Sequence, residues 1–138
     1  MAYNNRRISI EELENAARTP ILPLEDLNSP LVVESIQLLR KEQEYFVRST
    51  AGSEGISVAN SHVEQLYPIL NQRVIPYFIG KDVRGLEGHL FELYRYKSNY
   101  KLQGLAFWCP VAWVEFAILD MMGRITGKSI GQFLGGVI

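Results

Sequence analysis

The segment from Pro110 to Thr126 constrains the fold most, because it is apolar on nearly every side at helical spacing. Proline suits the first position of a helix and glycine suits the position after its last residue, so we expect one helix that begins at Pro110 and stops at Gly127. A helix without a polar face must be covered on most sides. The remaining residues must therefore supply elements that pack around it.

Three short segments rich in branched apolar and aromatic residues predict β-strands. They span residues 31–39, 45–50 and 55–59. The second link, Ala51 to Glu54, contains a glycine and is typical of a hairpin turn. The first link, Arg40 to Glu44, is short and charged. Consecutive strands with short links predict an antiparallel meander.

Capping patterns place the other helices. A Ser or Thr followed three residues later by Glu or Gln marks a helix start, and two such pairs predict helices from Ser9 and from Ser61. Ile75 precedes a proline and is expected to end the second of these helices, within which Pro68 predicts a kink or a start. Two more helical segments are expected, one capped by Asp82 and one starting at Ser129. The side chains expected to form the buried stripe of the Asp82 helix are Leu86, Leu90, Leu93 and Tyr94.

Length and composition restrict the class of protein. The 138 residues suffice for one domain with a core, and a net charge of −1 gives no general attraction to nucleic acid or to anionic membranes. The single cysteine, Cys109, cannot form an internal disulfide. No apolar segment follows Arg6 and Arg7 to make an export signal, and the apolar run 105–117 is interrupted and too short to span a bilayer. We therefore expect a cytoplasmic protein that binds neither nucleic acid nor membrane.

An ordered set of short motifs carries a family resemblance. In chain order they are the three-strand meander, Ile79-Gly80-Lys81-Asp82, Leu86-Glu87, the run Glu115 to Asp120 with Gly123, Gly127-Lys128, and Leu134-Gly135-Gly136. Together they resemble the N-terminal capping domain of the mandelate racemase and muconate lactonizing enzyme family, within the enolase superfamily. The expected fold is α+β, with a three-stranded antiparallel meander followed by a helical bundle and without the catalytic (β/α)8 barrel. The expected domains are an N-terminal extension at 1–30, the capping domain at 31–136, and the start of a truncated barrel at 137–138.

The resemblance implies an enzyme whose chemistry lies in the missing barrel. That barrel holds Mg²⁺ and a base that removes the proton next to a substrate carboxylate, in a dehydratase or a racemase/epimerase. The implied partners are the C-terminal barrel and a small carboxylate substrate. No catalytic or metal-binding residue is carried over to this chain, which needs no cofactor of its own and is expected to be inactive alone.

The resemblance also implies that two loops of the cap contact the substrate away from the metal. The short first loop leaves room for larger polar substrates, which favours sugar acids. The substrate-loop candidates are Arg40, Asn60, Ser61, His62 and Tyr100. Each has an ordinary structural alternative: a solvated hairpin end for Arg40, a helix N-cap for Ser61, and an exposed first-turn histidine for His62.

Other polar residues favour structural roles. Glu115 and Asp120 are five residues apart and do not share a helix face, so paired-carboxylate catalysis is disfavoured, and Arg124 is the natural partner of Asp120. Cys109 is interpreted as a small buried residue rather than a nucleophile. The apolar helix surface that a barrel would cover predicts homo-oligomers. The alternative function is a stand-alone, non-catalytic α+β interaction or binding module.

Overall fold

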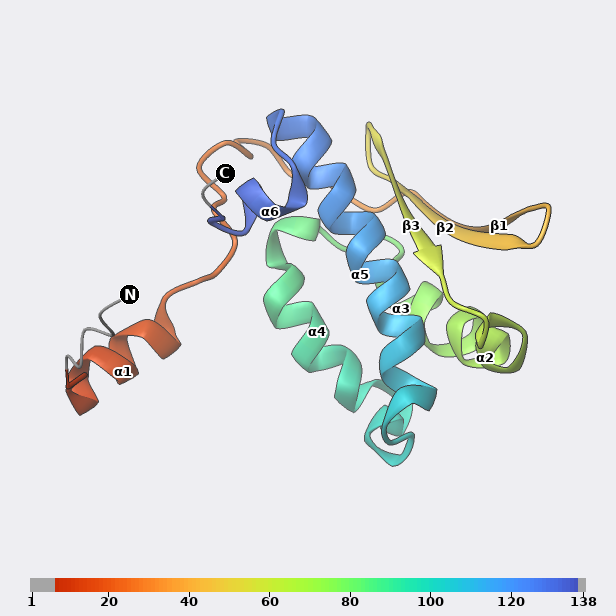
Figure 1. Ribbon diagram of the computed structural model, residues 1–138, viewed down its shortest axis with the longest axis horizontal. Coiled ribbons are helices and arrows are strands. Elements are labelled where there is room, and N and C mark those ends of the chain that lie inside the picture. The colour runs from red at the N-terminus through yellow and green to blue at the C-terminus, as the bar shows by residue number, and fades with distance from the viewer. Residues whose placement is uncertain (1–6, 137–138) are drawn as a thin grey trace, which may run out of the picture.

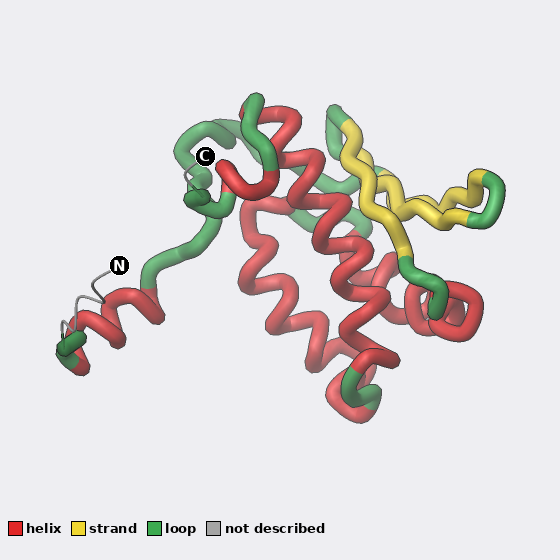
Figure 2. The backbone as a smooth tube through the Cα atoms, viewed as in Figure 1, coloured by secondary structure: helices red, strands yellow, loops and turns green. Residues whose placement is uncertain are grey.

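A three-stranded sheet packs against one long helix, around which shorter helices are arranged (Figures 1 and 2). The structure is a computed structural model that describes residues 7–136. The elements are α1 (Ile10–Arg18), β1 (Ser35–Lys41), β2 (Glu44–Thr50), β3 (Glu54–Ala59), α2 (Val63–Ile69), α3 (Ile75–Phe78), α4 (Leu86–Arg95), α5 (Leu105–Thr126) and α6 (Ile130–Phe133). This confirms the expected α+β fold, with a meander followed by helices. Residues 137–138, the expected start of a barrel, lie outside the described residues.

The sheet has the order β1-β2-β3, and both strand pairs are antiparallel. The first strand begins at Ser35 instead of residue 31, which corrects its predicted start. Residues 31–33 pair instead with the link between α3 and α4, where the Val33 amide donates to the Lys81 carbonyl oxygen at 2.9 Å and Val32 forms a bridge with Asp82. This pairing ties the segment before the sheet to the helical part of the fold.

The sheet contacts α5 most closely at Gly55 in β3. The side chains of β3 alternate between exposed and buried, and Gly55, Ser57 and Ala59 face the helix. An ideal Cβ at position 55 would lie 2.1 Å from the carbonyl oxygen of Ala117. Backbone therefore packs directly on backbone here, which requires glycine.

The central helix α5 begins at Leu105, five residues before the expected start at Pro110. Gly104 precedes it with a φ of +63°, a conformation that glycine adopts without strain, and Pro110 lies inside the helix. The C-terminal stop is confirmed, because Gly127 is left-handed with a φ of +68°. By length and composition alone the 22-residue helix could cross a membrane, contrary to the sequence-based expectation, but a buried core helix meets the same criteria. Here α5 packs on β2, β3, α2 and α6.

The helical stretch after the sheet differs from its predicted caps and end. Ser61 does not cap α2; the N-cap residue is His62, whose amide donates to Asn60 Oδ1 at 3.1 Å. Beyond α2, with Pro68 inside it, a π-helical turn (Leu70–Val74) leads into α3. The predicted end at Ile75 is wrong, because the helical stretch continues through Pro76, which falls in the first turn of α3.

The N-terminal arm is anchored although α1 is not. The predicted capping box of Ser9 and Glu12 is present in α1, but no residue of that helix is buried and it projects from the body (Figure 1). After α1 the chain packs on the domain through Leu22 and Leu27, which are buried. Glu87 in α4 accepts hydrogen bonds from the amides of Ile21 and Leu22, both at 2.8 Å. The Glu87 carboxylate, two buried leucines and an ion pair between Asp26 and Lys128 thus hold the arm.

Candidate functional site

A polar groove lies between the end of the β1–β2 hairpin and the link from β3 to α2. Its volume is about 340 Å³. The residues that line it are Gln43, Glu44, Tyr45, Val58, Ala59, Asn60, Ser61 and Glu64. These are the two loops that the sequence analysis expected to contact a substrate, and the sheet brings them together because β2 is the neighbour of both β1 and β3.

A tyrosine–glutamate pair forms one wall of the groove. The Tyr45 hydroxyl donates to Glu64 Oε1 at 3.0 Å, and this hydrogen bond raises the pKa of the tyrosine. Arg40 is the partner of Tyr45 in the strand register, and its guanidinium carbon lies 5.3 Å from the centre of the tyrosine ring. Arg40 Nε also donates to the carbonyl oxygen of Glu42 at 3.1 Å. Arg40 does not line the groove itself, but the Tyr45 ring that it covers does.

The asparagine and serine of the second loop line the groove directly. Asn60 is fixed at both ends of its amide, because Oδ1 accepts from the His62 amide and Nδ2 donates to Cys109 Sγ at 3.7 Å. Ser61 is exposed beside it and does not have the N-cap role that was its structural alternative. His62 is exposed at the start of α2 and is not among the lining residues.

Tyr100 lies outside the groove. It belongs to the turn between α4 and α5, and its ring centre is 6.5 Å from that of Tyr94, which stacks on Trp108. Of the five candidates, only Asn60 and Ser61 line the groove. A role in substrate contact remains a prediction for all five.

The substrate-loop candidates do not include four polar residues that line the groove: Gln43, Glu44, Tyr45 and Glu64. The signal that could have found Tyr45 is the hairpin register, because a two-residue turn at positions 42 and 43 places Arg40 opposite Tyr45. Glu64 had been interpreted as part of a capping box, whereas its carboxylate instead accepts a hydrogen bond from Tyr45.

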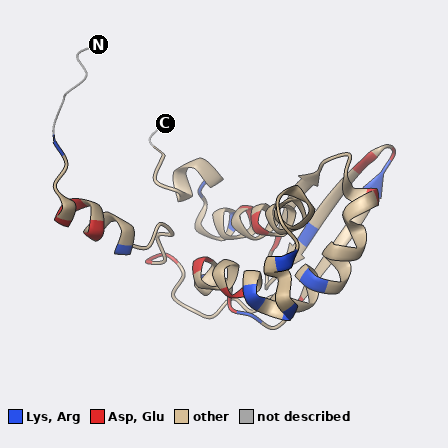
Figure 3. Cartoon of the chain, turned by 90° about the horizontal axis from the view of Figure 1, so that it is seen from below, with Lys and Arg blue, Asp and Glu red and all other residues tan. Residues whose placement is uncertain are grey.

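The groove offers hydrogen bonds more than charge attraction. Acidic and basic segments occur together at the hairpin end, and neither sign dominates the chain (Figure 3). Hydroxyl, amide and carboxylate groups converge from Tyr45, Asn60, Ser61 and Glu64, and the nearby cation Arg40 covers a ring. Such a surface suits the hydroxyl groups of a ligand better than its carboxylate.

The described residues do not fit a magnesium site. Within residues 7–136 no group of three or more His, Cys, Asp or Glu side chains is placed to hold a metal ion. The groove has two carboxylates, and that of Glu64 is engaged by Tyr45. Mg²⁺ is held mainly by carboxylate oxygens and waters, so no metal-dependent step is assigned to these residues.

No protein-family model matches the chain. Over 67 residues, 49% of the chain, it is 37% identical to a D-mannonate dehydratase from Sphingomonas sp. (strain SKA58), of which it covers 16%. A solved structure described as a "putative racemase from Roseobacter denitrificans" matches 77% of the chain at 25% identity, with a TM-score of 0.68.

A second solved structure shares the fold alone. It is a mandelate racemase/muconate lactonizing protein from Paracoccus denitrificans Pd1222, with 20% identity over 78% of the chain and a TM-score of 0.61. The chain spans 29% and 30% of the lengths of these two solved proteins. In sequence and in fold, it is therefore similar to the N-terminal domain of the mandelate racemase and muconate lactonizing enzyme family of the enolase superfamily.

Proposed function

We propose that this chain is the capping and substrate-specificity domain of a Mg²⁺-dependent dehydratase or racemase/epimerase that acts on a sugar acid. The similarity to a D-mannonate dehydratase supports the substrate class, because mannonate is a polyhydroxylated carboxylate. The similarity to a racemase supports the reaction class, in which a proton next to the carboxylate is removed. Domain boundaries at 30 and 136 and a cytoplasmic location belong to the same proposal.

The observation that carries the proposal is the polar groove formed by the two loops. Tyr45, Asn60, Ser61 and Glu64 offer donors and acceptors at one surface. Each hydroxyl group of a sugar acid can both donate and accept a hydrogen bond. Such a ligand can therefore replace the hydrogen bonds that water makes to the groove. The groove then holds the hydroxylated end of the substrate, while the carboxylate end reaches the domain that follows the cap.

The reacting groups belong to that second domain. Mg²⁺ would stabilise the charge that develops on the substrate carboxylate when the proton leaves. This chain's residues orient the distant hydroxyl groups and exclude water from the closed site. The 138-residue chain alone, mixed with Mg²⁺ and a sugar acid, is expected to give no turnover.

Kinetics of the longer enzyme test the groove. Tyr45→Phe removes the hydroxyl but keeps the ring, and Asn60→Ala removes the amide. Each should raise KM for a sugar acid about threefold to tenfold, the worth of one hydrogen bond, with a smaller change in kcat. Tyr67→Phe is the matched control, because Tyr67 follows Glu64 by one helical turn but lies outside the groove. Unchanged KM in both groove variants would contradict the proposal.

The gene sequence distinguishes the alternative, a stand-alone binding module, from the capping domain. A reading frame that continues past Ile138 into a segment with barrel length and Asp/Glu-rich strand ends supports the capping domain. A stop codon at that point, with groove variants that alter no enzymatic reaction, supports the module.

A further inference from the structure

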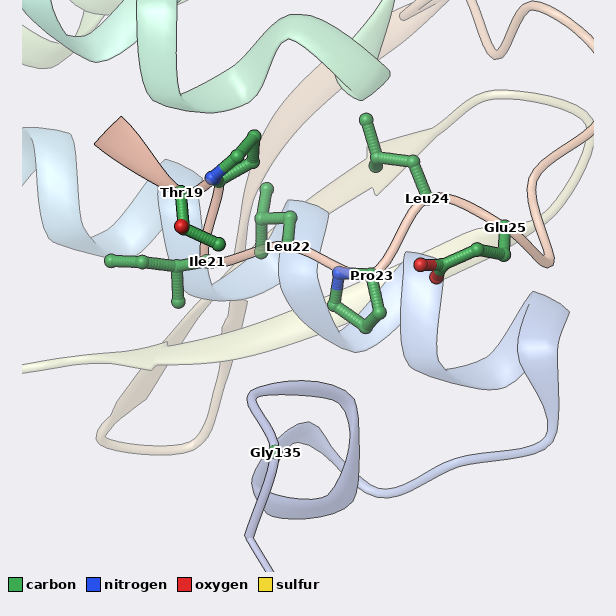
Figure 4. Close-up of a pocket in the computed structure, with 8 residues that line it drawn as sticks. Thr19, Ile21, Leu22, Pro23, Leu24, Glu25 and Gly135 are labelled. Atoms are coloured by element: carbon green, nitrogen blue, oxygen red, sulfur yellow. The ribbon is translucent and has the colours of Figure 1, made fainter. Parts of the chain in front are cut away.

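A second cleft, on the other side of α5 from the sheet, contains an acid to which the described residues offer no partner. The cleft has a volume of about 440 Å³ and lies between the N-terminal arm, α4, α5 and the C-terminal turn. Its lining residues are Ile21, Leu22, Leu86, Glu87, Leu90, Glu115, Leu119 and Leu134. The hollow of Figure 4 shares Ile21 and Leu22 with it and has Gly135 among its lining residues. The walls are mostly leucine, which makes the two acids unusual.

The two acids differ in their partners. Glu87 accepts two backbone hydrogen bonds from the arm and is thereby satisfied. Glu115 has no hydrogen bond or ion pair with any residue in the described range 7–136. It is partly buried, and desolvation raises the pKa of its carboxyl group. A carboxylate held in apolar surroundings without a partner is costly, and a cation that enters the cleft removes that cost.

We propose that this cleft receives a lysine or arginine side chain, carried on an apolar segment of the domain that follows the cap, and that Glu115 is its ion-pair partner. The inference rests on the proposed function for the identity of that domain. Leucines at 90, 119 and 134 match the alkyl stem of such a side chain, while Glu115 matches its charged end. Leu134 lines the cleft and Gly135 lines the hollow of Figure 4, so a chain that continues beyond them starts beside the cleft.

A second copy of this chain is the competing occupant. The helix α1 projects an apolar stripe that could enter such a cleft, but its first turn carries Glu11 and Glu12. Charge complementarity with Glu115 therefore favours a lysine or arginine of the following domain over α1 as the occupant.

The first experiment uses hexylammonium as the probe, with hexanol as its uncharged analogue. Methyl NMR of the 138-residue protein should show hexylammonium shifting the signals of Leu90, Leu119 and Leu134. Glu115→Gln should weaken the binding of hexylammonium about tenfold, which corresponds to the loss of one charge-assisted hydrogen bond. The binding of hexanol should be unchanged. Glu34→Gln, an exposed acid elsewhere, is the control and should change neither. Equal hexylammonium binding by the parent and Glu115→Gln, or no binding, would overturn the proposal.

The second experiment uses the longer protein. The pKa of Glu115, followed by isotope-edited NMR, should fall when the second domain is present. A pKa that stays raised there would refute the ion pair. Self-association of the 138-residue chain that hexylammonium abolishes would assign the cleft to a second copy and also refute it. These readouts concern a cleft remote from the polar groove, so they are independent of the KM test of the proposed function.

Discussion

A methyl group added at position 55 would collide with the backbone of α5. The Cβ of Gly55→Ala would lie 2.1 Å from the Ala117 carbonyl oxygen and 2.3 Å from the Met121 amide nitrogen. Backbone cannot move aside as a flexible side chain can, so the sheet must shift. We expect a loss of about 1–3 kcal/mol or more in the free energy of unfolding, measured by urea denaturation.

The matched control is Gly88→Ala in α4, where an added Cβ meets no atom within 4 Å. Alanine is the better helix former, so this variant should gain about 0.5–1 kcal/mol. A Gly55→Ala protein as stable as the parent would show that the sheet does not approach α5 as closely as described.

Single residues were predictable where their partners are near in sequence. The Asp120–Arg124 pair was expected from its spacing, and Arg124 Nε lies 2.8 Å from Asp120 Oδ2. The second bond of that carboxylate, accepted from the Ile56 amide at 2.9 Å, was not expected. It joins residues 64 positions apart, so no local pattern encodes it. The same limit concealed the Tyr45–Glu64 pair.

At the scale of elements, Asp82 joins the segment before β1 to the helices. Its carboxylate accepts from the Leu31 amide at 3.2 Å and forms an ion pair with Arg84 at 2.6 Å. The hydrogen bonds from Arg84 lower the pKa of Asp82 from 3.8 to about 2. A lowered folded-state pKa means that the carboxylate stabilises the fold above its unfolded pKa and loses this contribution as the pH falls toward 2.

Asp82→Asn should therefore lower the free energy of unfolding at neutral pH by about 1–2 kcal/mol, after allowance for solvent screening. The difference from the parent should shrink between about pH 4 and pH 2, followed by urea denaturation at several pH values. Asp26→Asn is the control, because Asp26 and Lys128 form an exposed pair, and it should change stability by less than about 0.5 kcal/mol. A pH-independent difference for Asp82→Asn would contradict the assignment.

Elements were predicted well where pattern and cap agree, and poorly where tertiary pairing decides. The three strands, α1, α6 and the end of α5 follow from alternation, capping pairs and glycine. The start of α5 was placed five residues late, because Pro110 has the preference for a first helical position yet is tolerated inside this helix. The start of β1 was placed early, because residues 31–33 are apolar like a strand but pair with Lys81 and Asp82.

For the molecule as a whole, the family resemblance predicted which loops meet, since those loops lie at the same end of the meander. It did not predict the chemistry of the groove between them, which depends on strand register and on a contact between β2 and α2. The arm shows the same division. The resemblance predicted an N-terminal extension at 1–30, whereas the attachment of that extension depends on Glu87, in a different element.

An apolar patch on the surface of α5 and β3 predicts self-association of the whole molecule. Val58 is 65% exposed and Phe116 50% exposed, and both line one shallow hollow with Ile56, Ala112, Trp113 and Ile130. Contiguous exposed apolar surface of this kind favours a partner, and a second copy is the partner always present.

Sedimentation velocity over a wide dilution series should reveal oligomers, and Val58→Lys with Phe116→Ser should shift the protein toward monomer. Phe91→Ser, which removes an even more exposed ring on α4, should leave the association unchanged. A parent protein that is monomeric at every concentration would contradict the prediction. Oligomers that dissociate only in the Phe91→Ser variant would show that the contact lies on α4 instead.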